Sequence, residues 1–173
     1  MKALILNSGL GHRMGEYTSK HPKCMTNVSD VDTILSRQLK QLAAYGVEDV
    51  VMTTGYYDEI LVNYCHSLGL PLKFTFVKNP LYDSTNYIYS IYCAKDYLCD
   101  SDLLLMHGDL VFDNEVLQSG IMREESCMTV SSTLPLPEKD FKAVVIDDKI
   151  RKVGVEFFEN AMAALPLYKL KLK

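Results

Sequence analysis

The sequence predicts an α/β fold: a Rossmann-like, three-layer α/β/α arrangement around a mostly parallel mixed sheet. Short apolar runs alternate with segments of helical periodicity over residues 2–107. The chain has 173 residues, of which 48% are hydrophobic, enough for one packed core and too few for two ordinary domains. We therefore expect residues 1–173 to form a single domain.

The expected strands are short apolar or β-branched runs bounded by Gly, Asn or His. They are Lys2 to Leu6, Asp49 to Thr54, Leu72 to Val77 and Leu103 to Met106. Helices are expected between them, where apolar residues recur at helical spacing: Val31 to Ala43, Ile60 to Leu68 and Ile88 to Leu98. Ser84 or Thr85 is expected to cap the third helix. This order favours parallel strands with helices on both faces of the sheet.

The pattern changes after Asp109. Residues 127–132 are expected to form another strand, and two apolar runs at 143–146 and 150–153 flank Asp147-Asp148-Lys149. Two short β-runs around such a turn are typical of a hairpin.

Charge and composition exclude several classes of protein. The net charge of −4 argues against nonspecific binding to nucleic acid or to an acidic membrane surface. No apolar segment is long enough for a signal peptide or a bilayer span, so a cytoplasmic protein is expected. The five cysteines and four histidines lack the spacing of metal ligands. Oligomerisation is left open.

A glycine-containing loop, Asn7 to Gly15, follows the first strand. Gly9 and Gly11 let the backbone approach an anion, so that successive N–H groups can surround phosphate oxygens. Arg13 adds a cation suited to phosphate. A flexible turn without a ligand explains the glycines alone equally well.

Two common nucleotide motifs do not fit this loop. A dinucleotide fingerprint requires a third glycine where Met14 stands, and no Walker A sequence is present. Farther along, Pro22 stiffens the chain before Lys23. Lys23 is then either an ordinary surface lysine or a second cation directed at the same site.

Three segments together resemble the nucleoside-triphosphate transferase family, which includes sugar-1-phosphate nucleotidyltransferases and bacterial phosphocholine cytidylyltransferases. The first is Leu6 to Met14 with Thr18 and Pro22-Lys23, where Asn7-Ser8 replaces the usual two alanines. The second, Asn79 to Tyr92, is most similar to the phosphocholine branch, and the third is Gly108-Asp109. Taken separately, Asn79-Pro80 and Gly108-Asp109 are also typical turns.

The resemblance implies roles for ten residues. Asn7, Ser8, Gly9 and Gly11 would bind the nucleotide, the two glycines through its β- and γ-phosphates. Arg13 would stabilise the departing pyrophosphate, and Lys23 would bridge the α-phosphate and the acceptor phosphate. Asn79, Thr85 and Asn86 would lie near the base and ribose, and Asp109 would bind Mg²⁺.

The implied reaction is Mg²⁺-dependent transfer of CMP from CTP to phosphocholine or a similar small phospho- or phosphonate acceptor, with release of pyrophosphate. The expected partners are therefore a nucleoside triphosphate and a small phosphorylated acceptor, without nucleic acid or membrane. Tyr82, Tyr87, Tyr89 and Tyr92 could help to enclose a quaternary ammonium group, although Tyr92 is better explained as a packing or surface residue.

Two alternatives stay open. One is a sugar-1-phosphate nucleotidyltransferase that uses UTP or dTTP, and the other is a nucleotide-binding chain without catalysis. Family members continue beyond the equivalent of Lys173 and supply a second Mg²⁺-binding Asp. The resemblance therefore implies a fold of the nucleotide-diphospho-sugar transferase type that is truncated on its C-terminal side. It also implies that the second Asp is missing, since Asp147 and Asp148 in a hairpin turn are poor substitutes for it.

Overall fold

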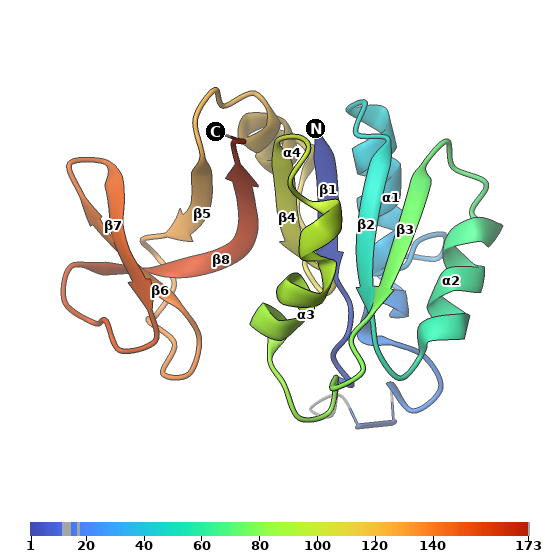
Figure 1. Ribbon diagram of the computed structural model, residues 1–173. Helices are drawn as coiled ribbons and strands as arrows, with labels where there is room; N and C mark the ends of the chain where they lie inside the picture. Colours follow the sequence, from blue (N-terminus) through green and yellow to red (C-terminus); the bar gives the residue numbers. More distant parts are fainter. Residues whose placement is uncertain (12–14, 17, 173) are drawn as a thin grey trace.

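A mixed sheet of eight strands runs through residues 1–11, 15–16 and 18–172, the parts of the chain that this computed structural model describes. The strand order is β3-β2-β1-β4-β8-β6-β7, and β5 pairs with β8 (Figure 1). The strands are β1 (Lys2–Leu6), β2 (Asp49–Thr54), β3 (Lys73–Lys78), β4 (Leu103–His107), β5 (Cys127–Ser131), β6 (Lys142–Ile146), β7 (Lys149–Gly154) and β8 (Ala161–Leu170). The predicted α/β fold with a mixed sheet is confirmed.

The first four strands form the parallel part of the sheet. β1 pairs in parallel with both β2 and β4, and β2 pairs in parallel with β3. Leu6 lies between Thr53 and His107 in this register. The residues that leave β1, β2 and β4 therefore emerge together at one edge, where ligands bind in sheets of this type.

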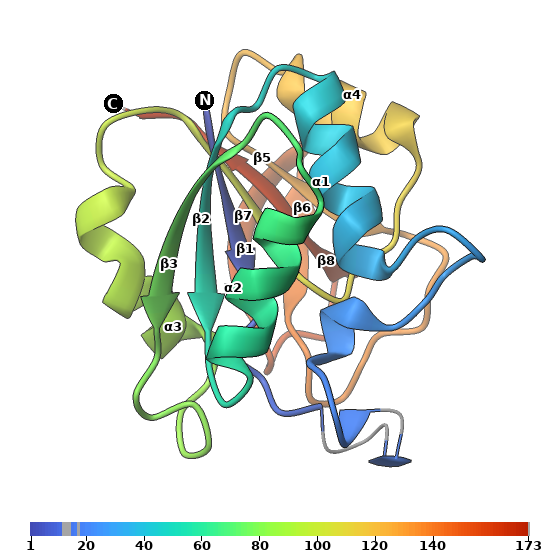
Figure 2. The ribbon, with the colours of Figure 1, turned by 90° about the vertical axis from the view of Figure 1, so that its right-hand side faces the viewer.

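Helices cover both faces of the parallel part, as Figure 2 shows. Ala3 and Ile5 pack in a core with residues of α1 (Ile34–Ala44), α2 (Asp58–Ser67) and α4 (Asn114–Ile121). The alternate residues Leu4 and Leu6 pack on the other face, in a core with residues of α3 (Tyr87–Ala94). A strand buried on both faces has no polar side, which explains the continuous apolar run of β1.

Two helix starts differ from the sequence-based expectation. α1 begins after Thr33, whose hydroxyl accepts a hydrogen bond from the Ser36 N–H while the Ser36 hydroxyl accepts one from the Thr33 N–H. Val31 lies outside the helix and is 81% exposed. α3 is capped by Asn86 instead of Ser84 or Thr85, because the Asn86 side chain accepts from the Ile88 N–H at 3.0 Å.

The sequence analysis did not predict β8. This strand pairs antiparallel with β4 through Leu167 to Leu170 and with β6 through residues 161–163. The alternating Lys-Leu sequence at 169–173 resembles a solvated tail, but Lys169, the lysine inside β8, is only 6% exposed and donates to the carbonyl oxygens of Ile121 and Arg123. A lysine whose ammonium group finds carbonyl partners can lie inside a sheet.

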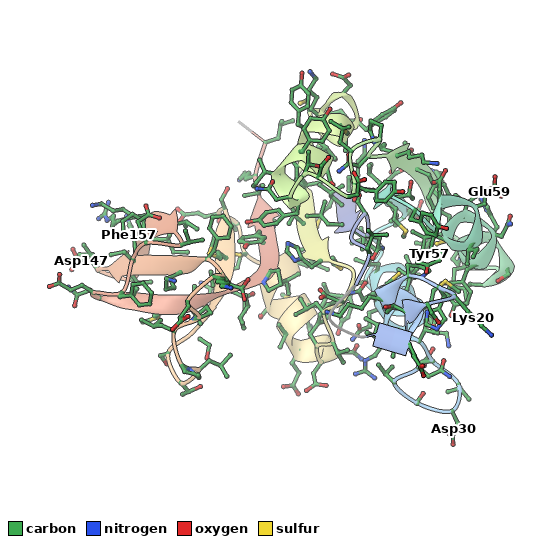
Figure 3. All side chains as sticks on the ribbon, turned by 90° about the horizontal axis from the view of Figure 1, so that it is seen from below. Lys20, Asp30, Tyr57, Glu59, Asp147 and Phe157 are labelled. Carbon is green, nitrogen blue, oxygen red and sulfur yellow. The ribbon has the colours of Figure 1, made fainter. Side chains whose placement is uncertain are left out.

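The expected hairpin is confirmed as β6 and β7. Asp147 and Asp148 join the strands with positive φ values of 51° and 57°, as a two-residue turn matched to strand twist requires. In Figure 3, Asp147 of this hairpin and Phe157, which follows β7, lie at the opposite end of the molecule from Lys20 and Tyr57. In the ranges that the structure describes, no helix is long and apolar enough to cross a membrane.

Candidate functional site

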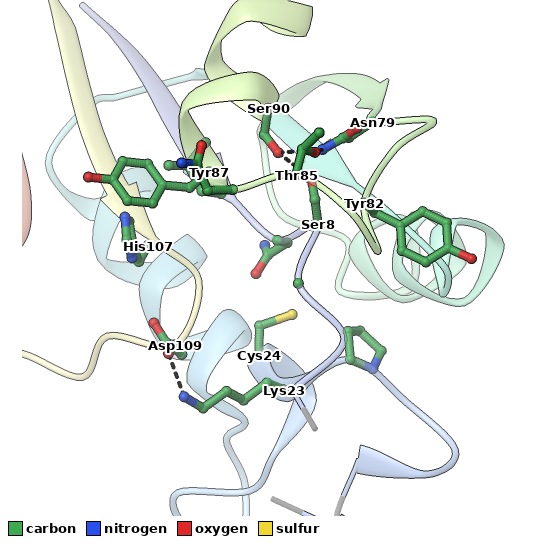
Figure 4. Close-up of a pocket in the computed structure, with 16 residues that line it drawn as sticks. Ser8, Lys23, Cys24, Asn79, Tyr82, Thr85, Tyr87, Ser90, His107 and Asp109 are labelled. Carbon is green, nitrogen blue, oxygen red and sulfur yellow. Dashed lines mark hydrogen bonds and ion pairs between the residues drawn. The ribbon is translucent and has the colours of Figure 1, made fainter. Parts of the chain in front are cut away.

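A cavity of about 400 Å³ opens where β1 and β4 end and α3 begins (Figure 4). It brings together all the predicted site residues that the structure describes, whereas Arg13 lies outside the described residues. The lining consists of Leu6, Asn7, Ser8, Gly9, Gly11, Pro22, Lys23, Cys24, Asn79, Tyr82, Thr85, Asn86, Tyr87, Ser90, His107 and Asp109. Segments far apart in the sequence thus meet in one site.

Hydrogen bonds fix the glycine loop at its start and at Gly11. The Asn7 N–H donates to the Thr53 carbonyl at 3.2 Å, and the Thr18 hydroxyl donates to the Gly11 carbonyl at 3.1 Å. Gly11 has a φ of +70°, and a Cβ there would lie 3.2 Å from the Thr18 methyl group. The positive φ therefore favours glycine at position 11, and an added Cβ would also be in tight contact with Thr18.

A buried hydrogen-bond network joins this loop to the start of α3. The Asn79 amide donates to the hydroxyls of Thr85 at 3.1 Å and Ser90 at 3.0 Å, and its Oδ1 accepts from the Leu81 N–H at 2.8 Å. The Ser90 hydroxyl donates to Ser8 at 3.1 Å. Asn79 is 1% exposed, and its bonds are satisfied within the protein. Its side chain therefore holds the shape of this wall and leaves little bonding capacity for a base.

Lys23 and Asp109 form an ion pair across the mouth of the cavity. The Lys23 Nζ lies 2.5 Å from an oxygen of Asp109, and the two side chains are 40% and 38% exposed. Lys23 opens a short 3-10 helix, η2 (Lys23–Met25), while the next residue, Cys24, is buried in the core. Burial raises the pKa of the Cys24 thiol far above its usual range, so Cys24 is a packing residue that anchors Lys23.

An aromatic wall faces the ion pair. The Tyr87 ring lies 4.9 Å from the His107 ring and 5.7 Å from the Phe141 ring, centroid to centroid. Burial raises the pKa of Tyr87 to about 12, with smaller contributions from Tyr168 and Asp140. Both Tyr87 and His107 line the cavity.

The His107 ring was not predicted as a site residue. Burial lowers its pKa against the opposing charges of Asp109 and Asp140, so the imidazole is uncharged near neutral pH. Among the described residues, its buried Nε2 and the buried Nδ2 of Asn7 have no hydrogen-bond partner. Most buried polar side-chain atoms have a hydrogen-bond partner, so these two nitrogens are available to a ligand in the cavity. Only the place of His107 directly before Gly108-Asp109 could have indicated it from the sequence.

The four tyrosines considered for a cation divide into two pairs. Tyr82 and Tyr87 line the cavity. Tyr89 packs near Tyr92 instead, and Lys95 lies 4.2 Å above the Tyr92 ring. Tyr92 is therefore a surface residue, as expected, and does not line the site.

The side chain of Asn7 occupies the space beside Gly108 that a larger residue at position 108 would need. A Cβ built on Gly108 would overlap the carboxamide of Asn7, although Gly108 does not have a positive φ. The asparagine that replaces the family's alanine is thus accommodated by a glycine on the neighbouring strand end.

We expect Gly108→Ala to lower the free energy of unfolding by about 1–3 kcal/mol, because overpacking forces a shift. Asn7→Ala in the same chain should remove most of that cost, so the two changes are strongly non-additive. Urea unfolding of the wild type, both single variants and the double variant measures this coupling. Additive changes in stability would show that the two residues do not compete for space.

Comparison with known proteins agrees with this geometry. Residues 3–131 match the model of the MobA-like NTP transferase domain family. The chain belongs to this family, and it is a nucleotidyltransferase domain with CMP- and CTP-transferring enzymes among its relatives.

Two relatives and one solved structure illustrate the similarity. The chain is 32% identical over 179 residues to CMP-5'-(3-aminopropyl)phosphonate synthase of Streptomyces rubellomurinus, covering 99% of the chain and 28% of that protein. It is 27% identical to choline-phosphate cytidylyltransferase of Streptococcus pneumoniae, covering 94% of the chain and 72% of that protein. The inositol-1-phosphate CTP transferase from T. maritima has the same fold, with a TM-score of 0.79, 24% identity, and coverage of 98% of this chain and 70% of the other. The chain thus spans little more than a quarter of the Streptomyces relative.

Proposed function

We propose that this chain carries the nucleotide site of a Mg²⁺-dependent nucleotidyltransferase that transfers CMP from CTP to phosphocholine or a similar small phospho- or phosphonate acceptor. The observation that supports this most is the Lys23–Asp109 pair beside Gly9 and Gly11 in a single cavity. A cation, a carboxylate and a glycine loop are the groups that a triphosphate and its metal require. The named activities of the two relatives favour CTP as the donor.

In the proposed reaction, an oxygen of the acceptor phosphate attacks the α-phosphorus of CTP. The bond from that phosphorus to the oxygen bridging the α- and β-phosphates breaks, and pyrophosphate leaves. The loop N–H groups would hold the triphosphate, Lys23 would offset charge between donor and acceptor, and Arg13 would act on the leaving pyrophosphate. Catalysis then consists of positioning and charge stabilisation, without a protein nucleophile.

Asp109 would hold the Mg²⁺ ion. When bound, this ion neutralises charge on the phosphate oxygens. Among the described residues, no group of three or more His, Cys, Asp or Glu side chains is arranged for a metal. A single half-exposed carboxylate still fits Mg²⁺, which proteins often bind through one or two carboxylates, substrate phosphates and water.

Lys23 contacts the same carboxylate that the metal would use. Lys23→Gln should therefore strengthen Mn²⁺ binding in the absence of nucleotide, by about fivefold if the half-exposed pair contributes about 1 kcal/mol. Electron paramagnetic resonance titration with Mn²⁺ measures this, and Lys40→Gln, which breaks the pair with Asp32, is the control. Unchanged or weaker Mn²⁺ binding in the Lys23 variant would show that Asp109 does not bind the metal.

An acceptor panel tests the proposed function. We expect pyrophosphate and a CMP-linked product with CTP, Mg²⁺ and phosphocholine or an aminoalkylphosphonate. Product only with glucose 1-phosphate and UTP or dTTP would identify a sugar-1-phosphate nucleotidyltransferase instead. Thermal stabilisation by CTP and Mg²⁺, with no pyrophosphate from any acceptor, would indicate nucleotide binding without catalysis.

A further inference from the structure

Lys142, the first residue of β6, has a completely buried side chain, with 0% exposed. Its ammonium group donates to the carbonyl oxygens of Pro137 at 2.6 Å and Asp140 at 3.3 Å, and lies 4.1 Å above the Phe158 ring. No ion pair joins it to a carboxylate in the described part of the chain. Burying a cation is costly, and here the compensating contacts come from backbone carbonyls and one aromatic face.

These hydrogen bonds hold the segment 137–141, which leads into β6. Lys142 binds the carbonyl of Pro137, the first residue of the segment, and that of Asp140 near its end. Phe141 comes next and places its ring edge-on against Tyr87. The chain of contacts runs from Lys142 through the segment to Tyr87, which lines the cavity.

The contact between Phe141 and Tyr87 places this segment beside the cavity, because Tyr87 lines it. The segment lies outside residues 3–131, which the family model matches. The Tyr87 wall is therefore supported by residues beyond the matched part of the domain.

The two ends of the cavity differ. Asn79, Thr85 and Ser90 form the hydrogen-bonded wall on one side, whereas Tyr87 and His107 lie on the other, with Lys23 and Asp109 below them (Figure 4). If the nucleoside occupies the Asn79 side, the part of the acceptor beyond its phosphate faces Tyr87.

We infer that Lys142 is a positioning residue for the acceptor: by holding the segment 137–141, it fixes Phe141 against Tyr87 and so sets the acceptor wall of the cavity. This inference rests on the proposed function, since it assigns the two sides of the cavity to donor and acceptor. Lys142 itself touches neither substrate.

The chain offers a matched control in Lys169. This second buried lysine also donates to two backbone carbonyls, those of Ile121 and Arg123, but it binds the end of α4 and is not part of the cavity lining. Lys142→Met and Lys169→Met therefore remove the same chemistry from two places. A purely structural role would make the two variants behave alike.

The experiment compares amide hydrogen exchange and steady-state kinetics of the wild type, Lys142→Met, Lys169→Met and Phe141→Ala. We expect faster exchange in residues 137–141 of Lys142→Met and not of Lys169→Met. The acceptor KM should rise at least about tenfold in Lys142→Met, because small displacements at a reacting site have large effects, while the KM for CTP changes less than about twofold. Phe141→Ala, which keeps the lysine, should raise the acceptor KM in the same direction.

Equal effects of the two lysine variants on acceptor KM, or unchanged exchange in residues 137–141, would overturn the inference. If Lys142→Met does not fold, Phe141→Ala is the deciding variant. An unchanged acceptor KM in that variant would show that the Tyr87 wall does not contribute to acceptor binding. A wild-type chain that forms no product with any acceptor contradicts the proposed function and the acceptor role with it. The exchange comparison needs no substrate and still shows whether Lys142 holds the segment.

Discussion

Lys23→Ala should lower kcat by about 10²–10³-fold, the usual loss when one preorganised charge-stabilising group is removed from a reacting site. Lys23 is 40% exposed, and within the described ranges its ion pair is with half-exposed Asp109. Since exposed ion pairs contribute at most about 1 kcal/mol to stability, the melting temperature should change little. Pyrophosphate release and thermal unfolding, measured on the same preparation, separate the two effects.

Lys40→Ala is the control for this variant. Lys40, on α1, is 50% exposed and pairs at 2.7 Å with Asp32, which precedes that helix. Neither residue lines the cavity. Its loss should leave kcat unchanged. If Lys23→Ala instead loses activity only in proportion to its stability, Lys23 is a structural lysine.

Asp109→Asn should have the larger effect, with turnover reduced by about a thousandfold or more. A metal that offsets phosphate charge contributes several kcal/mol to the transition state, and each 1.36 kcal/mol corresponds to about tenfold in rate. The substitution retains the size of the side chain but removes the charge that would hold Mg²⁺. Initial rates measured over a range of Mg²⁺ concentrations test it.

Asp113→Asn is the matched control, because Asp113 follows the same strand and pairs with Arg37 at 3.5 Å, with its side chain 88% exposed. It should keep wild-type turnover and metal dependence. Equal activity in the Asp109 and Asp113 variants would remove Asp109 from the metal site.

Most of the parallel part of the fold could be predicted from the sequence, because each buried strand is a continuous apolar run and each helix has a clear period. Because β1 and β4 are parallel neighbours, the residues that follow them, Gly9 and Asp109, lie at one edge of the sheet. Lys23 lies far along an irregular loop, where the residues alone left a surface lysine and a site cation open, and the resemblance to a known family favoured the site.

The antiparallel part was harder to predict, for a physical reason. β8 contains Pro166 and Lys169, and the burial of Lys169 depends on carbonyl partners supplied by α4 and the residues after it. Lys142 is buried in the same way by the segment before it. No local pattern shows that a lysine will find such partners.

The aromatic wall is also a product of long-range packing. Tyr87, His107 and Phe141 come from α3, β4 and the segment before β6, and they meet only in the folded chain. Asn79 and Thr85 show the opposite case. The resemblance implied contacts with the base and ribose, whereas the structure shows that their side chains bond to each other and to neighbouring residues.

The most direct test of the account is calorimetric titration of the wild-type chain with CTP, with and without Mg²⁺. The account predicts one CTP bound per chain, with an affinity at least about tenfold higher when Mg²⁺ is present, because the metal and the triphosphate share the site at Asp109. The absence of any binding heat for CTP, UTP or dTTP in the presence of Mg²⁺ would contradict it.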